Sequence, residues 1–235
     1  MAEKMLQPKN VDLRLERFDR RIVYEKCGRA KYISHLDLMR AMQRAIKRAG
    51  LPVWYTQGFN PHIYLMFPLT LSLGFESRVE VMDLALLEDM PFEETVRRLD
   101  AQMSEGMRIV SCALPVHKHT EITHAGYKIR FTADRSPEEC RGLFEEFLAR
   151  DKIEIEKRTK KKTANIVDIR PFIDVREISC GGDGVCLDLL LPAGGSFSLN
   201  ANVVIETFFE MYGLECDELC IERTKILIAN GELFT

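Results

Sequence analysis

The chain has 235 residues, of which 46% are hydrophobic and 29% are charged, and its formal net charge is −3. These values fit a globular protein with one large or two small domains and exclude a strongly basic or acidic chain. No run of 18 apolar residues is present and the N-terminus lacks the apolar core of a signal peptide, so we expect a cytoplasmic protein whose seven cysteines are reduced.

After an N-terminal extension, residues 1–19, the first half of the chain alternates between strand and helix patterns. Residues 21–33 favour a strand, and Ser34 caps a helix that ends at Gly50 before Pro52. The apolar stripe of this helix is formed by Leu36, Met39, Met42, Ile46 and Ala49. The other predicted elements of this half are a helix that starts at Pro91 and strands at residues 51–55, 63–71, 79–87 and 107–114.

The second half repeats this pattern without sequence identity to the first. Helices are predicted from Ser136 and over residues 200–212, and strands at residues 127–133, 153–157, 166–178, 185–191 and 219–228. We therefore predict an α+β fold of two duplicated ferredoxin-like βαββαβ units, with antiparallel sheets and helices on one face. The predicted divisions are residues 20–116 for the first unit, 117–124 for a linker and 125–235 for the second unit with a basic arm at 157–163.

Charges are unevenly distributed along the chain. Residues 20–62 contain nine lysines and arginines against two acids, whereas residues 76–106 contain nine acids and three arginines. Such segregation can create local fields that a near-neutral total conceals. On the first helix, the cations lie roughly opposite the apolar stripe, at Arg40, Arg44, Lys47 and Arg48.

A second basic block spans residues 157–163 and cannot be a buried strand. The cations of this block and of the Asp-Ile-Arg-Pro segment after it include Arg158, Lys160, Lys161, Lys162 and Arg170. Together with the cations of the first helix, they are candidates for binding an RNA backbone. The alternative is that both blocks are solvated, one as a helix face and the other as a hairpin tip. Sequence alternation also predicts that Asp168 and Arg170 share one face as an ion pair.

Two polar motifs are expected to meet at one edge of the first unit. One is the Ser-His-Leu-Asp start of the first helix, and the other is the loop at residues 56–62. In the predicted strand order both emerge at the same end of the sheet, where the helix N-terminus attracts anions. The candidate anion pocket consists of Ser34, His35, Asp37, Gln57, Asn60 and His62. The alternative interpretation is a helix cap and a hairpin loop that do not bind a ligand.

Other kinds of site lack support in the sequence. No Gly-x-Ser-x-Gly elbow and no phosphate-binding loop is present. Three histidines near the predicted linker, His117, His119 and His124, lack an anchored fourth ligand, so no metal site is predicted.

The stretch KYISHLDLMRAMQRAIKRAGLPVWYTQGFNPHIYLMFPLTLSLGFES resembles the bacterial radical-SAM-linked proteins, whose domain of unknown function is found beside or fused to B12-binding radical SAM proteins. The resemblance covers residues 20–84, and Arg158-Thr159-Lys160 and Asp168-Ile169-Arg170-Pro171 add to it. It implies a radical SAM protein as partner, with SAM, the iron–sulfur cluster and cobalamin in that partner and no cofactor in this chain. The gene neighbours of such proteins, ribonuclease E/G and ribosomal proteins, point to RNA or a ribosomal component.

We therefore expect an accessory RNA-binding or substrate-presenting protein that works with a radical SAM partner in RNA or ribosome modification or maturation. One alternative is a metal-independent RNA-processing enzyme with His35 and His62 as catalytic acid and base. Another is a pure protein–protein adaptor for the radical SAM subunit, with the acidic residues 76–106 as its docking face.

Overall fold

The computed structural model describes residues 16–57, 59–158, 164–182, 184–195 and 197–234. The first half contains two helices, α1 (His35–Arg48) and α2 (Phe92–Asp100). Its strands are β1 (Phe18–Lys26), β2 (Leu65–Met66), β3 (Glu76–Leu86) and β4 (Met107–Ala113). The second half contains α3 (Pro137–Ala149) and α4 (Ala201–Tyr212). Its strands are β5 (Ile122–Ala133), β6 (Glu154–Arg158), β7 (Ala164–Asp168), β8 (Asp174–Gly181), β9 (Gly184–Pro192) and β10 (Cys216–Ile228).

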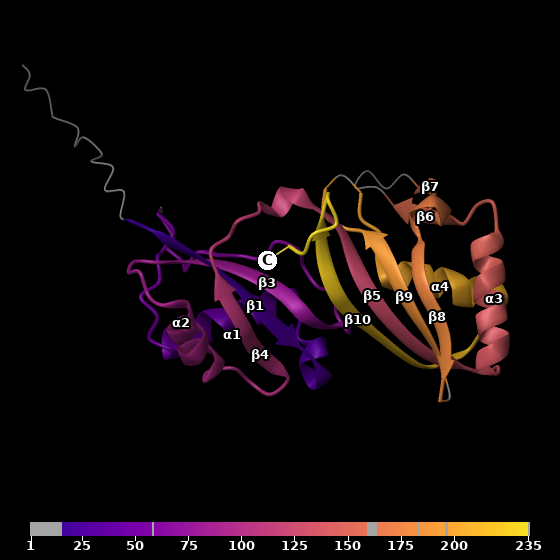
Figure 1. Cartoon of the computed structure of the whole chain (residues 1–235), viewed down its shortest axis with the longest axis horizontal. Coiled ribbons are helices and arrows are strands. Elements are labelled where there is room, and N and C mark those ends of the chain that lie inside the picture. The colour runs from indigo at the N-terminus through magenta and orange to yellow at the C-terminus, as the bar shows by residue number, and fades with distance from the viewer. Residues whose placement is uncertain (1–15, 58, 159–163, 183, 196, 235) are drawn as a thin grey trace, which may run out of the picture.

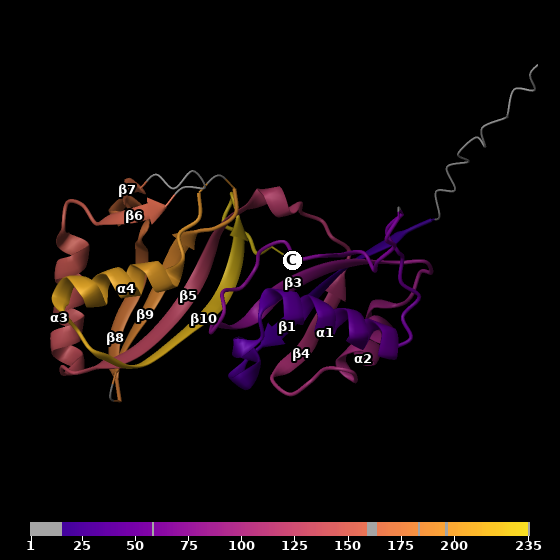
Figure 2. The same ribbon diagram turned by 180° about the vertical axis from the view of Figure 1, so that it is seen from behind.

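One mixed sheet of eight strands runs through both halves, so the predicted α+β class is confirmed. Its order is β4-β1-β3-β10-β5-β9-β8, with β2 paired to β3. Figures 1 and 2 show α1, α2 and α4 on one side of this sheet and α3 at the end beyond β8. The pair β6 and β7 forms a separate hairpin between α3 and β8.

The sheets of the two halves form one continuous mixed sheet, so the predicted antiparallel pairing holds within each half but not at their junction. Within each half the neighbouring strands are antiparallel. At the junction, however, β10 pairs with β3 in parallel through Glu222 with Glu76 and Arg223 with Ser77. Because this pairing joins segments about 145 residues apart, local sequence patterns cannot reveal it.

Each half has its own apolar core. In the first half, Met42 and Ile46 of α1 pack against Ile22 of β1 and Met82 of β3. The second core is rich in phenylalanine, and Phe208 of α4 contacts Phe131, Phe144, Phe147, Phe209 and Tyr212. Two residues of the first half, Phe75 and Val81, belong to the second core, so the halves also pack against each other.

Four expected strands differ in the structure. The strand predicted at residues 63–71 is reduced to β2, and the one at residues 166–178 is divided into β7 and β8 by a 3₁₀ helix at Arg170–Phe172. The segment predicted as one strand at residues 21–33 ends at Lys26, and Gly28, with φ of 57°, begins a short 3₁₀ helix. The strand predicted at residues 51–55 is reduced to single bridges at Val53 and Tyr55. Pro52, which has no N–H to donate, lies between Leu51 and Val53 and disfavours a regular ladder there.

Candidate functional site

The start of α1 is a well-formed helix cap. Ser34 Oγ accepts a hydrogen bond from the backbone N–H of Asp37 at 3.2 Å and donates to Asp37 Oδ2 at 2.8 Å. Arg40 Nη1 donates to the other carboxylate oxygen at 3.2 Å. The hydroxyl of Ser34 and the guanidinium of Arg40 lower the pKa of the Asp37 carboxyl. The polar groups of Ser34 and Asp37 are therefore used within the helix itself.

His35 packs against an aromatic side chain beneath the helix start. Its ring lies 5.2 Å from the ring of Phe67 in an edge-on arrangement, and Phe67 in turn meets Tyr24 edge-on at 6.5 Å. His35 is partly buried. This packing joins the first turn of α1 to the segment that follows β2.

The loop at residues 56–62 is closed by its own hydrogen bonds. The backbone N–H of Thr56 donates to the carbonyl of His62 at 2.8 Å, and the side-chain oxygen of Thr56 lies 3.0 Å from His62 Nδ1. Gln57, Phe59 and Asn60 are exposed. The His62 ring is thus held by groups of its own loop, which is the structure of a stabilised turn.

The helix start and this loop lie at opposite ends of the sheet. At the end of β1, Lys26 Nζ donates to the carbonyl oxygens of Lys31 and Ile33, directly before Ser34. The start of α1 is therefore fixed beside the C-terminal end of β1.

The loop is fixed at the N-terminal end of β1, because Val53 bridges to Leu86 and Leu86 pairs with Phe18. Along β3, nine residues separate Leu86 from Ser77, the partner of Lys26, which corresponds to about 30 Å. The structure thus does not bring the predicted anion pocket together, since strand 51–55 does not run up the sheet as expected. Its residues form two separate groups, Ser34, His35 and Asp37 at one end and Gln57, Asn60 and His62 at the other.

The cations of α1 remain on the surface. Arg40, Arg44, Lys47 and Arg48 are all exposed. Arg40 pairs with Asp37, and Arg48 donates to the side chain and the carbonyl of Gln102. Neither Arg44 nor Lys47 forms an ion pair with a residue that the structure describes. The four side chains span about 100° of the helix, so they form a single stripe, called the α1 stripe below.

Most other cations of residues 20–62 are paired with acids of residues 76–106. Arg21 binds Asp83 through two hydrogen bonds of 2.8 Å, with both side chains buried. Arg20 pairs with Asp89, and Lys31 pairs with Glu76. The charge segregation seen in the sequence is therefore partly neutralised in the fold, whereas Glu88, Glu93 and Glu105 of the predicted acidic docking face stay exposed and form no ion pair with a described residue.

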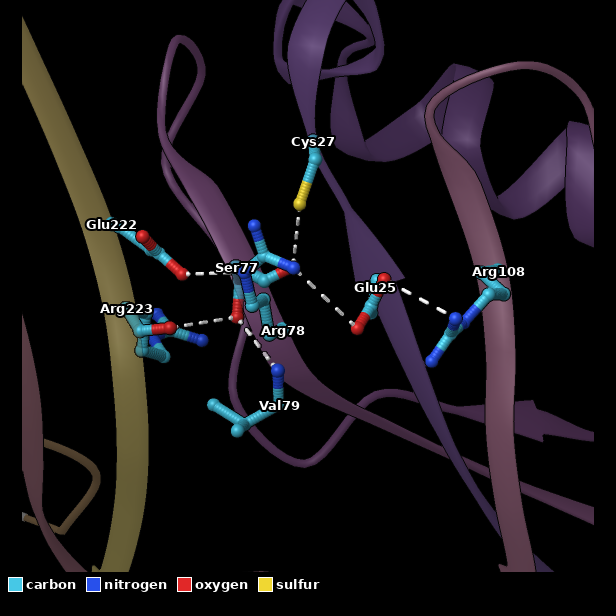
Figure 3. Close-up of polar contacts among 8 residues, drawn as sticks. All are labelled: Glu25, Cys27, Ser77, Arg78, Val79, Arg108, Glu222 and Arg223. Atoms are coloured by element: carbon cyan, nitrogen blue, oxygen red, sulfur yellow. Dashed lines mark hydrogen bonds and ion pairs between the residues drawn. The ribbon is translucent and has the colours of Figure 1, made fainter.

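A row of exposed charges crosses the junction of the two halves (Figure 3). Arg78 of β3 lies 3.1 Å from Glu222 of β10 and 4.0 Å from Glu25 of β1, which in turn lies 3.7 Å from Arg108 of β4. Pairs of this kind, in which the arginine is largely exposed, contribute little free energy individually.

The second basic block is described only in part. Arg158 ends β6, whereas Lys160, Lys161 and Lys162 lie outside the described residues. Asp168 and Arg170 do not form the predicted ion pair. Asp168 Oδ1 accepts from the backbone N–H groups of Ile153 and Arg170, and these bonds lower the pKa of its carboxyl. The Arg170 guanidinium donates to the carbonyl of Leu148 at 2.5 Å, so it anchors the hairpin to α3.

Sequence reasoning missed the 3₁₀ helix before α1, which lies on the surface. It exposes Arg29 and Tyr32, and the Tyr32 side chain is 68% exposed. The signal that could have revealed it is Gly28, which ends the strand early.

Some kinds of site receive no support from the described part of the chain. There, no three His, Cys, Asp or Glu side chains group as a metal site would require. All seven cysteines are free thiols. No helix in the described ranges has the length and apolar composition to cross a membrane.

The sequence profile of a bacterial family, described as "Uncharacterized protein conserved in bacteria (DUF2344)", matches residues 20–200. The chain belongs to this family. The DUF2344 match includes both polar motifs, the α1 stripe and the β6–β7 hairpin. No curated protein matches the sequence.

Two solved structures are similar to this DUF2344 protein. A chain in the crystal structure of a Cbf5-Nop10-Gar1 complex is 13% identical with a TM-score of 0.47, and the match covers 88% of this chain and 48% of that one. The DUF2344 protein thus spans about half the length of that chain. An unknown protein from Galdieria sulphuraria is 12% identical with a TM-score of 0.27, and the match covers 88% of this chain and 99% of that one. Both TM-scores are below 0.5, so neither likeness bears on function.

Proposed function

We propose that this protein is an accessory RNA-binding protein that presents RNA or a ribosomal component to a radical SAM partner. The observation that carries the RNA part is the α1 stripe, because its four cations are all exposed and none of them pairs with a described acid of residues 76–106. Between residues 40 and 48 the stripe is about 12 Å long, enough to contact neighbouring phosphates of one strand.

Exposed aromatic residues lie before and after the α1 stripe in the sequence, and they favour a single-stranded nucleic acid as the ligand. Tyr32 precedes the start of α1, and Tyr55 and Phe59 follow its end in the loop at the opposite end of the sheet. A cationic track with aromatic rings on which bases can stack is the usual arrangement for sequence-tolerant binding of single strands. Lys31 Nζ lies 5.4 Å from the Tyr32 ring at one end, although its charge is paired with Glu76.

The geometry bears differently on the two alternatives. An acid–base pair of His35 and His62 would need both imidazoles within reach of one substrate group, and about 30 Å of sheet separates their segments. An adaptor that docks through the acidic residues 76–106 would have fewer free carboxylates than the sequence suggests, because Asp83, Asp89 and Glu94 are each paired with arginine. The exposed carboxylates of Glu88, Glu93 and Glu105 would still be available to it.

The radical SAM partner is proposed from the family resemblance of residues 20–84. In this proposal SAM, the iron–sulfur cluster and cobalamin belong to the partner, and the chain described here supplies the RNA-binding surface. Co-purification of the two proteins tests the association, and a partner that does not remain bound to the tagged chain contradicts it.

We also infer that each half is a ferredoxin-like unit and that the fold is a duplication. What supports this is the order of the strands in space. Numbered along each half, and leaving out the β6–β7 hairpin, the strands lie in the order 4-1-3-2 in both, as β4-β1-β3-β2 and β10-β5-β9-β8.

RNA binding is tested by filter binding of a labelled single-stranded RNA at several salt concentrations. Replacing Arg44 and Lys47 by glutamine removes two cations, so we expect an affinity lower by tenfold or more at low salt. The slope of log K against log salt should decrease by about 1.4, which is about 0.7 for each lost phosphate contact.

The matched control replaces Arg135 and Lys152, exposed cations beside the two ends of α3, by glutamine. This variant has the same net charge as the first and should bind RNA almost as the unmodified protein does. Equal losses in the two variants, or an affinity that does not change with salt, would contradict RNA binding by the α1 stripe.

A further inference from the structure

A pocket of about 530 Å³ lies between the β6–β7 hairpin and α4. Its walls are β6, β7, the segment at residues 197–200 and one face of α4. The α4 residues that line it are spaced by three and four positions, so they follow one side of the helix: Val203, Glu206, Thr207 and Glu210. The size is in the range of pockets that accept a ligand or an anchoring side chain.

The floor of this pocket is apolar. Ile155, Val167 and Val203 are partly buried there, and Leu199 is fully buried. Phe197 also lines the pocket, with its ring 4.4 Å from that of Phe172. Apolar side chains that stay accessible in a concave site favour an apolar group of a ligand.

The rim of the pocket carries four exposed carboxylates, Glu154 and Glu156 from β6 and Glu206 and Glu210 from α4. None of them forms an ion pair with a described residue, and Glu206 accepts one hydrogen bond, from Asn202. No described lysine or arginine lines the pocket. These glutamates differ in this respect from Glu80 and Glu94 of the first half, which are both paired with arginine.

We propose that this pocket docks a cationic segment of a protein partner, in which one apolar side chain rests on the floor and flanking lysines or arginines meet the four glutamates. The charge complementarity selects a positive ligand, and the apolar floor selects one that also carries an aliphatic or aromatic group. A polyamine satisfies only the first requirement, and a nucleic acid is repelled by the rim. The proposal does not depend on RNA binding by the α1 stripe, which lies in the other half of the chain.

The test uses the full chain and three fluorescein-labelled peptides, with sequences Gly-Lys-Lys-Leu-Lys-Lys-Gly, the same peptide with serine for leucine, and the same peptide with glutamates for lysines. Fluorescence anisotropy measures each dissociation constant. We expect the leucine peptide to bind about tenfold or more tightly than the serine peptide, since a buried leucine is the main difference. The acidic peptide should not bind.

Replacing Glu154 and Glu206 by glutamine should weaken binding of the leucine peptide by about tenfold. The matched control replaces Glu138 and Glu177, exposed glutamates outside the pocket, by glutamine and should leave the affinity unchanged. Equal thermal midpoints for both variants show that the fold is retained, because all four side chains are exposed.

Three results would overturn the proposal. The first is equal affinity for the leucine and serine peptides, which would show that the floor is not used. The second is equal loss in the pocket and control variants, which would indicate attraction to the acidic protein as a whole. The third is spermidine displacing the leucine peptide at equal concentration of positive charge, which would indicate a site for small polycations.

Discussion

Arg223 of β10 and Glu80 of β3 form a buried ion pair, with Nη1 2.9 Å from Oε1 and side-chain exposures of 3% and 2%. The guanidinium also donates to the carbonyl oxygens of Leu69 and Thr70 and lies 5.8 Å from the ring of Tyr127. The Arg223 side chain therefore contacts three segments: β3, residues 69–70 and β5. Both terminal nitrogens of the guanidinium are hydrogen-bonded, as a buried charge favours, whereas Nε has no partner among the described residues.

Replacing Arg223 by methionine should be strongly destabilising. The change leaves the Glu80 carboxylate buried without its partner, so we expect the free energy of unfolding to fall by about 3–5 kcal/mol. Urea denaturation measures the free energy of unfolding of both proteins. The matched control is Arg78→Met, which also breaks a pair between β3 and β10 but at a side chain that is 63% exposed. A loss of at most about 1 kcal/mol is expected there. Equal effects would show that burial does not decide the difference.

Replacing Ser34 by alanine separates helix capping from ligand binding. Because Ser34 Oγ accepts the backbone N–H of Asp37, its loss should lower the free energy of unfolding by about 1 kcal/mol. The affinity for RNA should be unchanged. Ser136→Ala, which removes the corresponding cap of α3, should have a similar effect on stability. Loss of RNA affinity without loss of stability in Ser34→Ala would instead indicate an anion site at the start of α1.

Two glycines should respond to alanine in opposite directions. Gly106 has a φ of 81°, and a Cβ there would lie 2.4 Å from the carbonyl oxygen of Cys27, so Gly106→Ala should destabilise by about 2 kcal/mol or more. Gly142 lies inside α3, and a Cβ there would meet open space. Gly142→Ala should therefore stabilise by about 0.5–1 kcal/mol. Thermal or urea unfolding of both variants checks the signs, and a stabilising Gly106→Ala would contradict the packing described here.

Stability should fall at alkaline pH through Cys112. Burial raises the pKa of this thiol from 9.0 to about 11. In the unfolded chain the thiol ionises from about pH 9. The contribution of the neutral thiol to the free energy of unfolding is therefore fully present below pH 9 and is lost as the pH rises towards 11. The decline between these values should be shallower in Cys112→Ala than in the unmodified protein. Burial also raises the pKa of Tyr24, which acts on both proteins alike. Parallel stability curves for the two proteins would contradict this role of Cys112.

The helices were predictable because their signals are local. Ser34 and Ser136 cap α1 and α3 as their sequence context indicates. The predicted apolar stripe of α1 is correct for Met42 and Ile46, but Leu36, which was assigned to it, is 59% exposed. The α+β class followed from the alternation of such helices with strands. The separation of the two groups of the predicted anion pocket was not predictable in the same way, because it depends on the position of one segment, residues 51–55, relative to β3. Pro52 was the available signal against a regular strand there.

The pairing of charges between distant segments could not be predicted from the sequence. A basic block and an acidic block in one chain suggested separate exposed surfaces, whereas Arg21 and Asp83 bind each other on adjacent strands. Pairing of this kind depends on strand register, which only the complete fold determines. The acidic pocket beside α4 was missed for a related reason, since its four glutamates are divided between residues 154–156 and 206–210.

The parallel contact between β3 and β10 has a consequence for biosynthesis. During translation β3 and Glu80 are made more than 130 residues before β10 brings Arg223 to them. Until then the nascent first half has an open sheet edge at Glu76 and Ser77 and an acid beside Tyr24 that lacks its cation. The first half therefore reaches its final stability only when the ribosome has completed β10, and chains truncated before Cys216 should be preferred substrates for cellular proteases.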